Sequence, residues 1–127
     1  MAHPCERVLV VDDDADNRDA IAMILEEEGI DVRAATAHDA LDALRAGYRP
    51  DVIVLDLVMP GISGRVFREH LERDARLGAI PIVLCTASPQ LAQDAGFVDA
   101  VIAKPFDADA FFRALAELCL EAKRTVL

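Results

Sequence analysis

The sequence has few basic residues for its length. Acidic residues outnumber basic ones 23 to 13, which gives a formal net charge of −10. This balance disfavours a nucleic-acid-binding surface, because such a surface needs clustered lysine and arginine. It suits a soluble protein that meets cations or basic patches on a partner.

The sequence also lacks the patterns of membrane, secreted and zinc-binding proteins. No stretch approaches the about 20 apolar residues of a membrane span, and the N-terminus is not basic-then-apolar like a signal peptide. The three cysteines, Cys5, Cys85 and Cys119, have neither CxxC nor Cys/His ligand spacing. We therefore expect a cytoplasmic protein with reduced thiols and no membrane contact.

The organisation is that of one domain covering residues 1–127. We find no internal repeat, low-complexity tract or linker, and 54% hydrophobic residues suit a globular core. The Met1 start and the absence of a linker tail favour a complete, stand-alone chain.

Five short apolar runs alternate with helical patterns. The predicted strands are 7–11, 31–35, 51–55, 80–85 and 100–103, and the predicted helices follow at about 15–28, 37–46, 64–71, 88–96 and 107–123. Continuous aliphatic runs are typical of parallel strands buried on both faces, whereas 31–35 alternates and is expected nearer an edge. The pattern predicts an α/β (βα)5 fold: an open parallel sheet with helices on both faces.

Polar residues stand where the predicted strands end. Asp12 and Asp13 end the first strand, Asp56 the third, Thr86 the fourth and Lys104 the fifth. In such sheets function collects in the crevice beyond the carboxyl ends of the strands. Clustered carboxylates there repel one another unless a cation offsets them. The oxygen-rich set suits Mg²⁺, and lysine supplies a second cation for a phosphoryl group.

The motifs at these positions resemble those of the CheY-like receiver domain of two-component response regulators. The matching elements are VVDDD at 10–14, VLDLVMPGISG at 54–64, CTA at 85–87 and AKPF at 103–106. The resemblance implies a doubly wound, flavodoxin-like three-layer sandwich with a five-stranded parallel sheet of order 2-1-3-4-5.

The resemblance also implies a site and its partners. Asp56 is the expected phosphoacceptor, and the donor is a sensor histidine kinase or a histidine phosphotransfer protein. The expected ligands of Mg²⁺ (or Mn²⁺) are Asp12, Asp13, Asp56 and the backbone carbonyl of Val58. The expected phosphoryl-binding and switch groups are Thr86, the backbone N–H of Ala87 and Lys104. The remaining expectations are a cis peptide bond before Pro105, a turn at Gly61, and tuning of phosphate hydrolysis by Val58 and Ser88.

Two features depart from the family pattern. Only 17 residues separate Thr86 from Lys104, so the helix at 88–96 is expected to be about one turn shorter than usual. Val101 occupies the position of the usual switch aromatic, three residues before Lys104. We therefore expect the phosphorylation chemistry to be intact and the readout to be altered.

The last predicted helix carries two apolar stripes. Phe111, Leu115 and Leu118 fit the core, while the second stripe lies on a neighbouring face and comprises Phe112, Ala116 and Leu120. One interpretation is an unusually deeply packed helix. The other is a surface for a downstream protein or a homodimer.

Two other functions are compatible with parts of this sequence. A receiver fold can act as a docking or dimerisation module without phosphorylation. A small haloacid-dehalogenase-type phosphatase also uses aspartate, lysine and Mg²⁺, but Asp16 stands where its motif has threonine or valine, and no cap domain fits. We therefore do not expect an enzyme beyond catalysis of its own phosphorylation and slow dephosphorylation.

Overall fold

The computed structural model describes the backbone of residues 4–56, 64–86, 98–104 and 107–125, with their side chains apart from those of Asp56 and residues 123–125. The strands are β1 (Arg7–Val11), β2 (Asp31–Ala35), β3 (Val52–Asp56), β4 (Ile82–Thr86) and β5 (Ala100–Ala103). The helices are α1 (Ala15–Glu27), α2 (Ala37–Arg45), α3 (Gly64–Glu72), α4 (Ala75–Gly78) and α5 (Ala108–Thr125).

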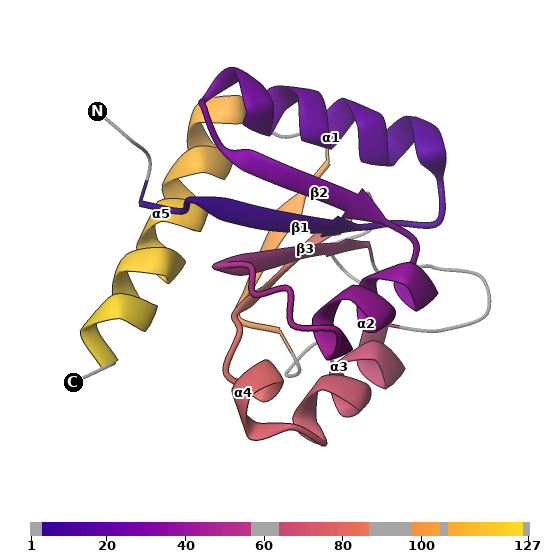
Figure 1. The fold of residues 1–127 in the computed structure, drawn as a ribbon. Helices are drawn as coiled ribbons and strands as arrows, with labels where there is room; N and C mark the ends of the chain where they lie inside the picture. The colour runs from indigo at the N-terminus through magenta and orange to yellow at the C-terminus, as the bar shows by residue number, and fades with distance from the viewer. Residues whose placement is uncertain (1–3, 57–63, 87–97, 105–106, 126–127) are drawn as a thin grey trace.

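The strands form a parallel sheet of order β2-β1-β3-β4-β5, which confirms the predicted topology (Figure 1). β2 lies at an edge, as its alternating pattern predicted, whereas every residue of β4 is buried. In the described part of the chain, no helix combines the length and the apolar character that crossing a membrane requires.

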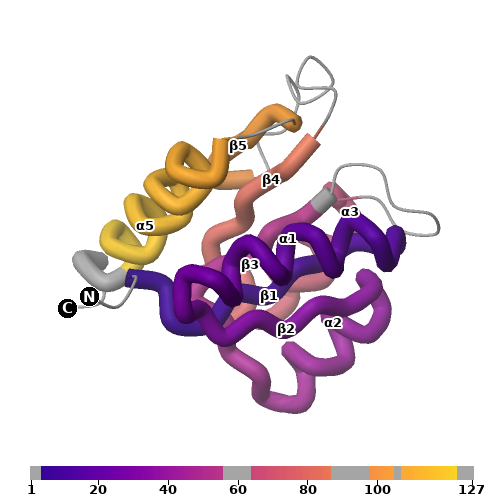
Figure 2. Tube along the Cα trace, turned by 90° about the horizontal axis from the view of Figure 1, so that it is seen from above, coloured from indigo at the N-terminus to yellow at the C-terminus, as the bar shows by residue number. Residues whose placement is uncertain are grey.

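Alternate strand residues build two cores, one on each face of the sheet. Leu9, Val11, Ile53 and Leu55 pack with α2 and α3. Their neighbours in sequence, such as Val8 and Val10, pack on the other face with α1 and α5. Accordingly α2 and α5 lie on opposite sides of the strands (Figure 2). In a three-layer arrangement of this kind, functional residues collect at the carboxyl ends of the strands.

Helix α1 begins and ends where the sequence predicted. The Asp14 side chain accepts hydrogen bonds from the backbone N–H groups of Asp16 (2.9 Å) and Asn17 (3.4 Å), and so caps the helix. Gly29, with φ 81°, follows the helix, in the left-handed region that favours glycine. The third acid of the opening cluster therefore has a structural role.

Helix α4 was not predicted. It has four residues and buries Leu77, which is too short a stretch to show a helical period. The Asp74 side chain caps the helix by accepting a hydrogen bond of 2.9 Å from the backbone N–H of Arg76. This hydrogen bond lowers the pKa of Asp74 below its ordinary value of 3.8.

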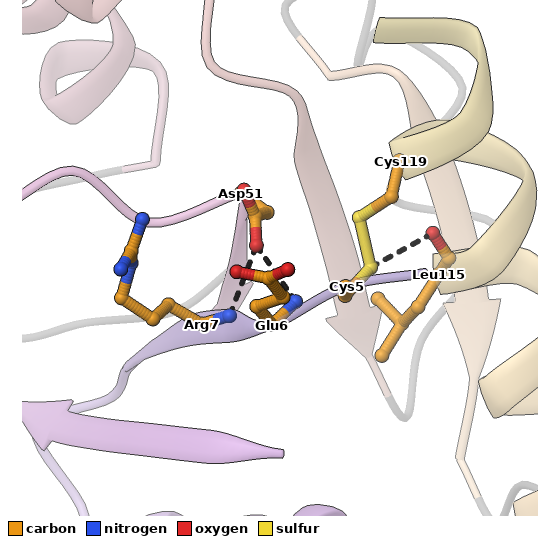
Figure 3. Close-up of a disulfide and its surroundings, with 6 residues drawn as sticks. All are labelled: Cys5, Glu6, Arg7, Asp51, Leu115 and Cys119. Atoms are coloured by element: carbon orange, nitrogen blue, oxygen red, sulfur yellow. Dashed lines mark hydrogen bonds between the residues drawn. A yellow bond between two sulfur atoms is a disulfide. The ribbon is translucent and has the colours of Figure 1, made fainter. Parts of the chain in front are cut away.

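The expectation of reduced thiols is wrong for two of the three cysteines. Cys5 and Cys119 form a disulfide with Cα atoms 5.6 Å apart, whereas the buried Cys85 in β4 is not disulfide-bonded. No local pattern indicated the pair, because 114 residues separate its members. Only the packing of α5 beside the start of β1 brings them together (Figure 3).

The single tyrosine, Tyr48, offers a clean test of the packing beside β2. Partial burial raises its pKa above the ordinary value of 10.0, and the nearby charge of Asp31 adds to the rise, while Arg33, 5.1 Å from the ring centroid, opposes it. The tyrosinate absorbance of the native protein should therefore titrate above 10.0, and Asp31→Asn should lower the midpoint. The stability that Tyr48 contributes is present below its unfolded pKa and is lost as pH rises through the folded pKa. A midpoint at or below the ordinary value would contradict this packing.

Candidate functional site

The carboxyl ends of β1, β3, β4 and β5 lie in one row. Val11 pairs with Leu55, Asp56 with Cys85, and Thr86 with Ala103. Asp12 directly follows Val11 in sequence, and Lys104 directly follows Ala103. The backbone of Asp12, Asp56, Thr86 and Lys104 is therefore collected at the carboxyl ends of four neighbouring strands.

Asp12 is a buried carboxylate at the end of β1. It is 3% exposed, and its Oδ1 accepts a hydrogen bond of 2.9 Å from the backbone N–H of Asp14. Its backbone is fixed on both sides, since its N–H donates to the Ala35 carbonyl (3.1 Å) and its carbonyl accepts from Arg18 Nη1 (2.7 Å). A buried negative charge is costly unless hydrogen bonds or a cation compensate it, so this position favours a cation nearby.

Asp13 is half-buried and points to the start of a helix. Its Oδ1 accepts a hydrogen bond of 3.3 Å from the backbone N–H of Ala37, the first residue of α2. A helix N-terminus attracts negative charge, so the position of the Asp13 side chain at the start of α2 is electrostatically favourable. The sequence did not predict the hydrogen bond between Asp13 and Ala37, nor the one between Arg18 and the Asp12 carbonyl. Arg18 could have been noticed as a base one turn into the helix that follows the acidic cluster.

Thr86 and Lys104 occupy the other half of the row. Thr86 is 4% exposed and Lys104 is half-buried, and the Lys104 backbone N–H donates to the Thr86 carbonyl at 2.8 Å. This bond extends the pairing of β4 with β5 by one residue, so the lysine leaves the sheet beside the threonine.

Several predicted residues lie outside the described part of the chain. They are Val58, Gly61, Ala87, Ser88 and Pro105, together with the shortened helix predicted at 88–96 and the side chain of Asp56. Within the described residues, no group of three His, Cys, Asp or Glu side chains could hold a metal ion. The two carboxylates that are described, Asp12 and Asp13, are hard oxygen donors of the kind that Mg²⁺ accepts alongside water, so these residues fit the ion.

The second stripe of α5 is partly covered. Phe112 and Ala116 are half-buried, whereas Leu120 is 43% exposed. Phe112, Ala116 and their neighbours Asp109 and Arg113 line a shallow groove of about 440 Å³. Val101, at the position of the missing aromatic, is 42% exposed on the edge strand β5. The stripe is therefore neither a deeply packed core nor a fully open surface.

Comparisons with known proteins agree with this architecture. The DNA-binding dual master transcriptional regulator RpaA of Synechocystis sp. is 35% identical over 108 residues, which cover 81% of this chain and 44% of that protein. The chain thus spans less than half the length of this curated relative. The receiver domain of a signal transduction histidine kinase from Syntrophus aciditrophicus is 26% identical with a TM-score of 0.81, and 94% of each chain is covered.

A further neighbour shares the fold at lower identity. The receiver domain of the sensor histidine kinase PA1611 from Pseudomonas aeruginosa is 21% identical with a TM-score of 0.77, and 94% of this chain and 98% of that one are covered. That protein was crystallised with a magnesium ion coordinated in its active site cleft. Residues 8–116 match the model of the response regulator receiver domain. With the sheet order and the row of strand-end residues, this match shows that the chain belongs to the response regulator receiver domain family.

Proposed function

We propose that this receiver domain, residues 1–127, accepts a phosphoryl group on Asp56 from the phosphohistidine of a sensor kinase or phosphotransfer protein in the cytoplasm. One observation carries the proposal. Asp12 is buried at the end of β1, in the same row of strand ends as Asp56, Thr86 and Lys104. Burying a carboxylate beside other acidic residues costs folding free energy, so a functional site explains this arrangement better than the fold alone does.

The transfer is a displacement at phosphorus. A carboxylate oxygen of Asp56 forms the new P–O bond while the P–N bond of the phosphohistidine breaks, and the imidazole nitrogen keeps the electron pair and takes up a proton. Asp12, Asp13, Asp56 and the Val58 carbonyl would hold Mg²⁺, which supplies charge neutralisation at the phosphoryl oxygens. Lys104 adds a point charge on the other side of the group.

The phosphoryl group then acts as a switch. It adds nearly two negative charges, which the Thr86 hydroxyl, the Ala87 N–H and Lys104 would bind through charge-assisted hydrogen bonds. Thr86 ends β4 and Lys104 directly follows β5. A movement of these two residues on phosphorylation would therefore shift the β4–β5 side of the sheet. The partner is a downstream protein or a second copy of the chain.

A docking module that works without phosphorylation is the second candidate. The observation that favours it is the exposure of Leu120 and Val101, large apolar residues on α5 and β5. Both functions could use the stripe of Phe112, Ala116 and Leu120, and phosphorylation distinguishes them.

Acetyl phosphate tests the proposal directly. The native chain, incubated with acetyl phosphate and Mg²⁺, should gain the mass of one phosphoryl group, and peptide mapping should place it on Asp56. Chelation of the metal should suppress the gain, because the carboxylate cluster then repels the incoming anion. An unmodified chain in the presence of Mg²⁺ would favour the docking module instead.

A further inference from the structure

We propose that Cys5 and Cys119 form a reversible dithiol–disulfide site, which glutathione disulfide closes and which fixes the C-terminal half of α5 to the start of β1. The two residues are each 1% exposed, and their sulfur atoms are bonded in the structure. Cys5 lies just before β1, whereas Asp12 follows β1 and Thr86 ends β4, so the disulfide stands at the opposite end of the parallel strands from these two residues.

The surroundings hold the two sulfur atoms together in either redox state. Cys5 Sγ lies 3.2 Å from the Leu115 carbonyl oxygen, a distance at which the thiol form donates an S–H···O hydrogen bond to α5. The backbone next to Cys5 is also fixed, because Asp51 Oδ2 accepts from the N–H groups of Glu6 (2.7 Å) and Arg7 (3.0 Å). A reduced Cys5 therefore stays beside Cys119, ready to close the bond again.

Cys119 is the member of the pair that borders a groove at the surface, although it is itself 1% exposed. Cys119 forms part of the wall of a groove of about 420 Å³, together with Pro50, Asp51, Arg76, Ile80 and Ala122. Cys85, which is not part of the disulfide, lies within the fully buried strand β4. The groove can hold a small disulfide next to Cys119, and local opening at the end of α5 would expose the Cys119 sulfur, with Cys5 as the resolving thiol.

The exchange balances in two steps. The Cys119 thiolate attacks one sulfur of glutathione disulfide, which forms a mixed disulfide and releases one glutathione thiolate. The Cys5 thiolate then attacks the Cys119 sulfur and releases the second glutathione. The protein loses two electrons and two protons, and both protons are carried away on glutathione thiols.

The reversibility is inferred from the proposed cytoplasmic location of the protein and not from the geometry of the Cys5–Cys119 disulfide. Cytoplasmic disulfides in most organisms are transient or redox-sensing because glutathione and thioredoxin keep thiols reduced. In this respect alone the inference rests on the proposed function, which places the chain beside a cytoplasmic kinase partner. The closed form restrains a loop of 114 residues, so oxidation should stabilise the fold and reduction should loosen the end of α5.

Alkylation after denaturation of the wild-type chain, which makes the buried Cys85 accessible but leaves disulfides intact, followed by intact mass spectrometry tests the site. After equilibration with excess glutathione disulfide we expect one alkylated thiol, Cys85, and a Cys5–Cys119 peptide cross-link; excess glutathione should give three. Reduction should lower the thermal unfolding midpoint by about 10 °C and increase hydrogen exchange in α5. Three alkylated thiols at every glutathione ratio would overturn the proposal, as would an unchanged midpoint and unchanged exchange.

Two variants separate the pair from other thiol effects. Cys85→Ala should keep the response of the midpoint to reduction, and Cys5→Ala/Cys119→Ala should lose it. If a variant does not fold, the comparison of the oxidised and reduced wild-type chain alone tests the proposal. Labelling of Asp56 by acetyl phosphate should proceed in both redox states. Its absence from both would overturn the proposed phosphorylation and leave the cysteine site standing.

Discussion

Replacing Asp56 with asparagine is expected to abolish phosphoryl incorporation from acetyl phosphate. The amide has almost the shape of the carboxylate but is not a nucleophile, so no P–O bond forms. The backbone of Asp56 pairs with Cys85 within the sheet, and this pairing does not depend on the side-chain charge. Intact mass spectrometry of the native and variant chains, treated side by side with Mg²⁺, measures the loss.

Asp14→Asn is the matched control. Asp14 belongs to the same acidic cluster, but its side chain caps α1, and asparagine caps a helix as well as aspartate does. We expect this variant to be phosphorylated like the native chain. If Asp56→Asn still gained a phosphoryl group, or if Asp14→Asn lost it, the acceptor would have been assigned to the wrong carboxylate.

Phe111→Ala is expected to cost about 3–5 kcal/mol of unfolding free energy. Phe111 is fully buried in the core that α5 shares with β1 and β3, and its removal leaves a cavity there. A loss of this size is a large part of the about 5–15 kcal/mol that stabilises a typical domain. Urea unfolding, followed by circular dichroism, measures it.

Phe112→Ala provides the comparison on the same helix. Phe112 is half-buried, and its ring stacks on that of Phe111 with centroids 6.2 Å apart, so its removal exposes less of the core. We expect a loss of about 1–1.5 kcal/mol. Similar losses for the two variants would mean that α5 does not turn its Phe111 face to the sheet.

Local patterns were sufficient for most of the fold. Short apolar runs that alternate with helical patterns predicted five parallel strands, and Asp14 and Gly29 predicted the limits of α1, because each signal lies within a few residues of its effect. The strand order was known only through the family resemblance, since periodicity says nothing about which strands are neighbours. Helix α4 was not predicted because a stretch of four residues is too short to show a helical period.

The sequence by itself determined that acids, a threonine and a lysine follow the strands, and hence which chemistry this edge of the sheet can perform. Only the tertiary structure decided how those groups are held: Asp12 buried, and Asp13 bonded to the first residue of α2. It also decided that Cys5 meets Cys119 across 114 residues, and how far the second stripe of α5 is covered. The physical reason is that strands and caps form from contacts close in the chain, whereas burial and disulfide pairing depend on where distant segments pack.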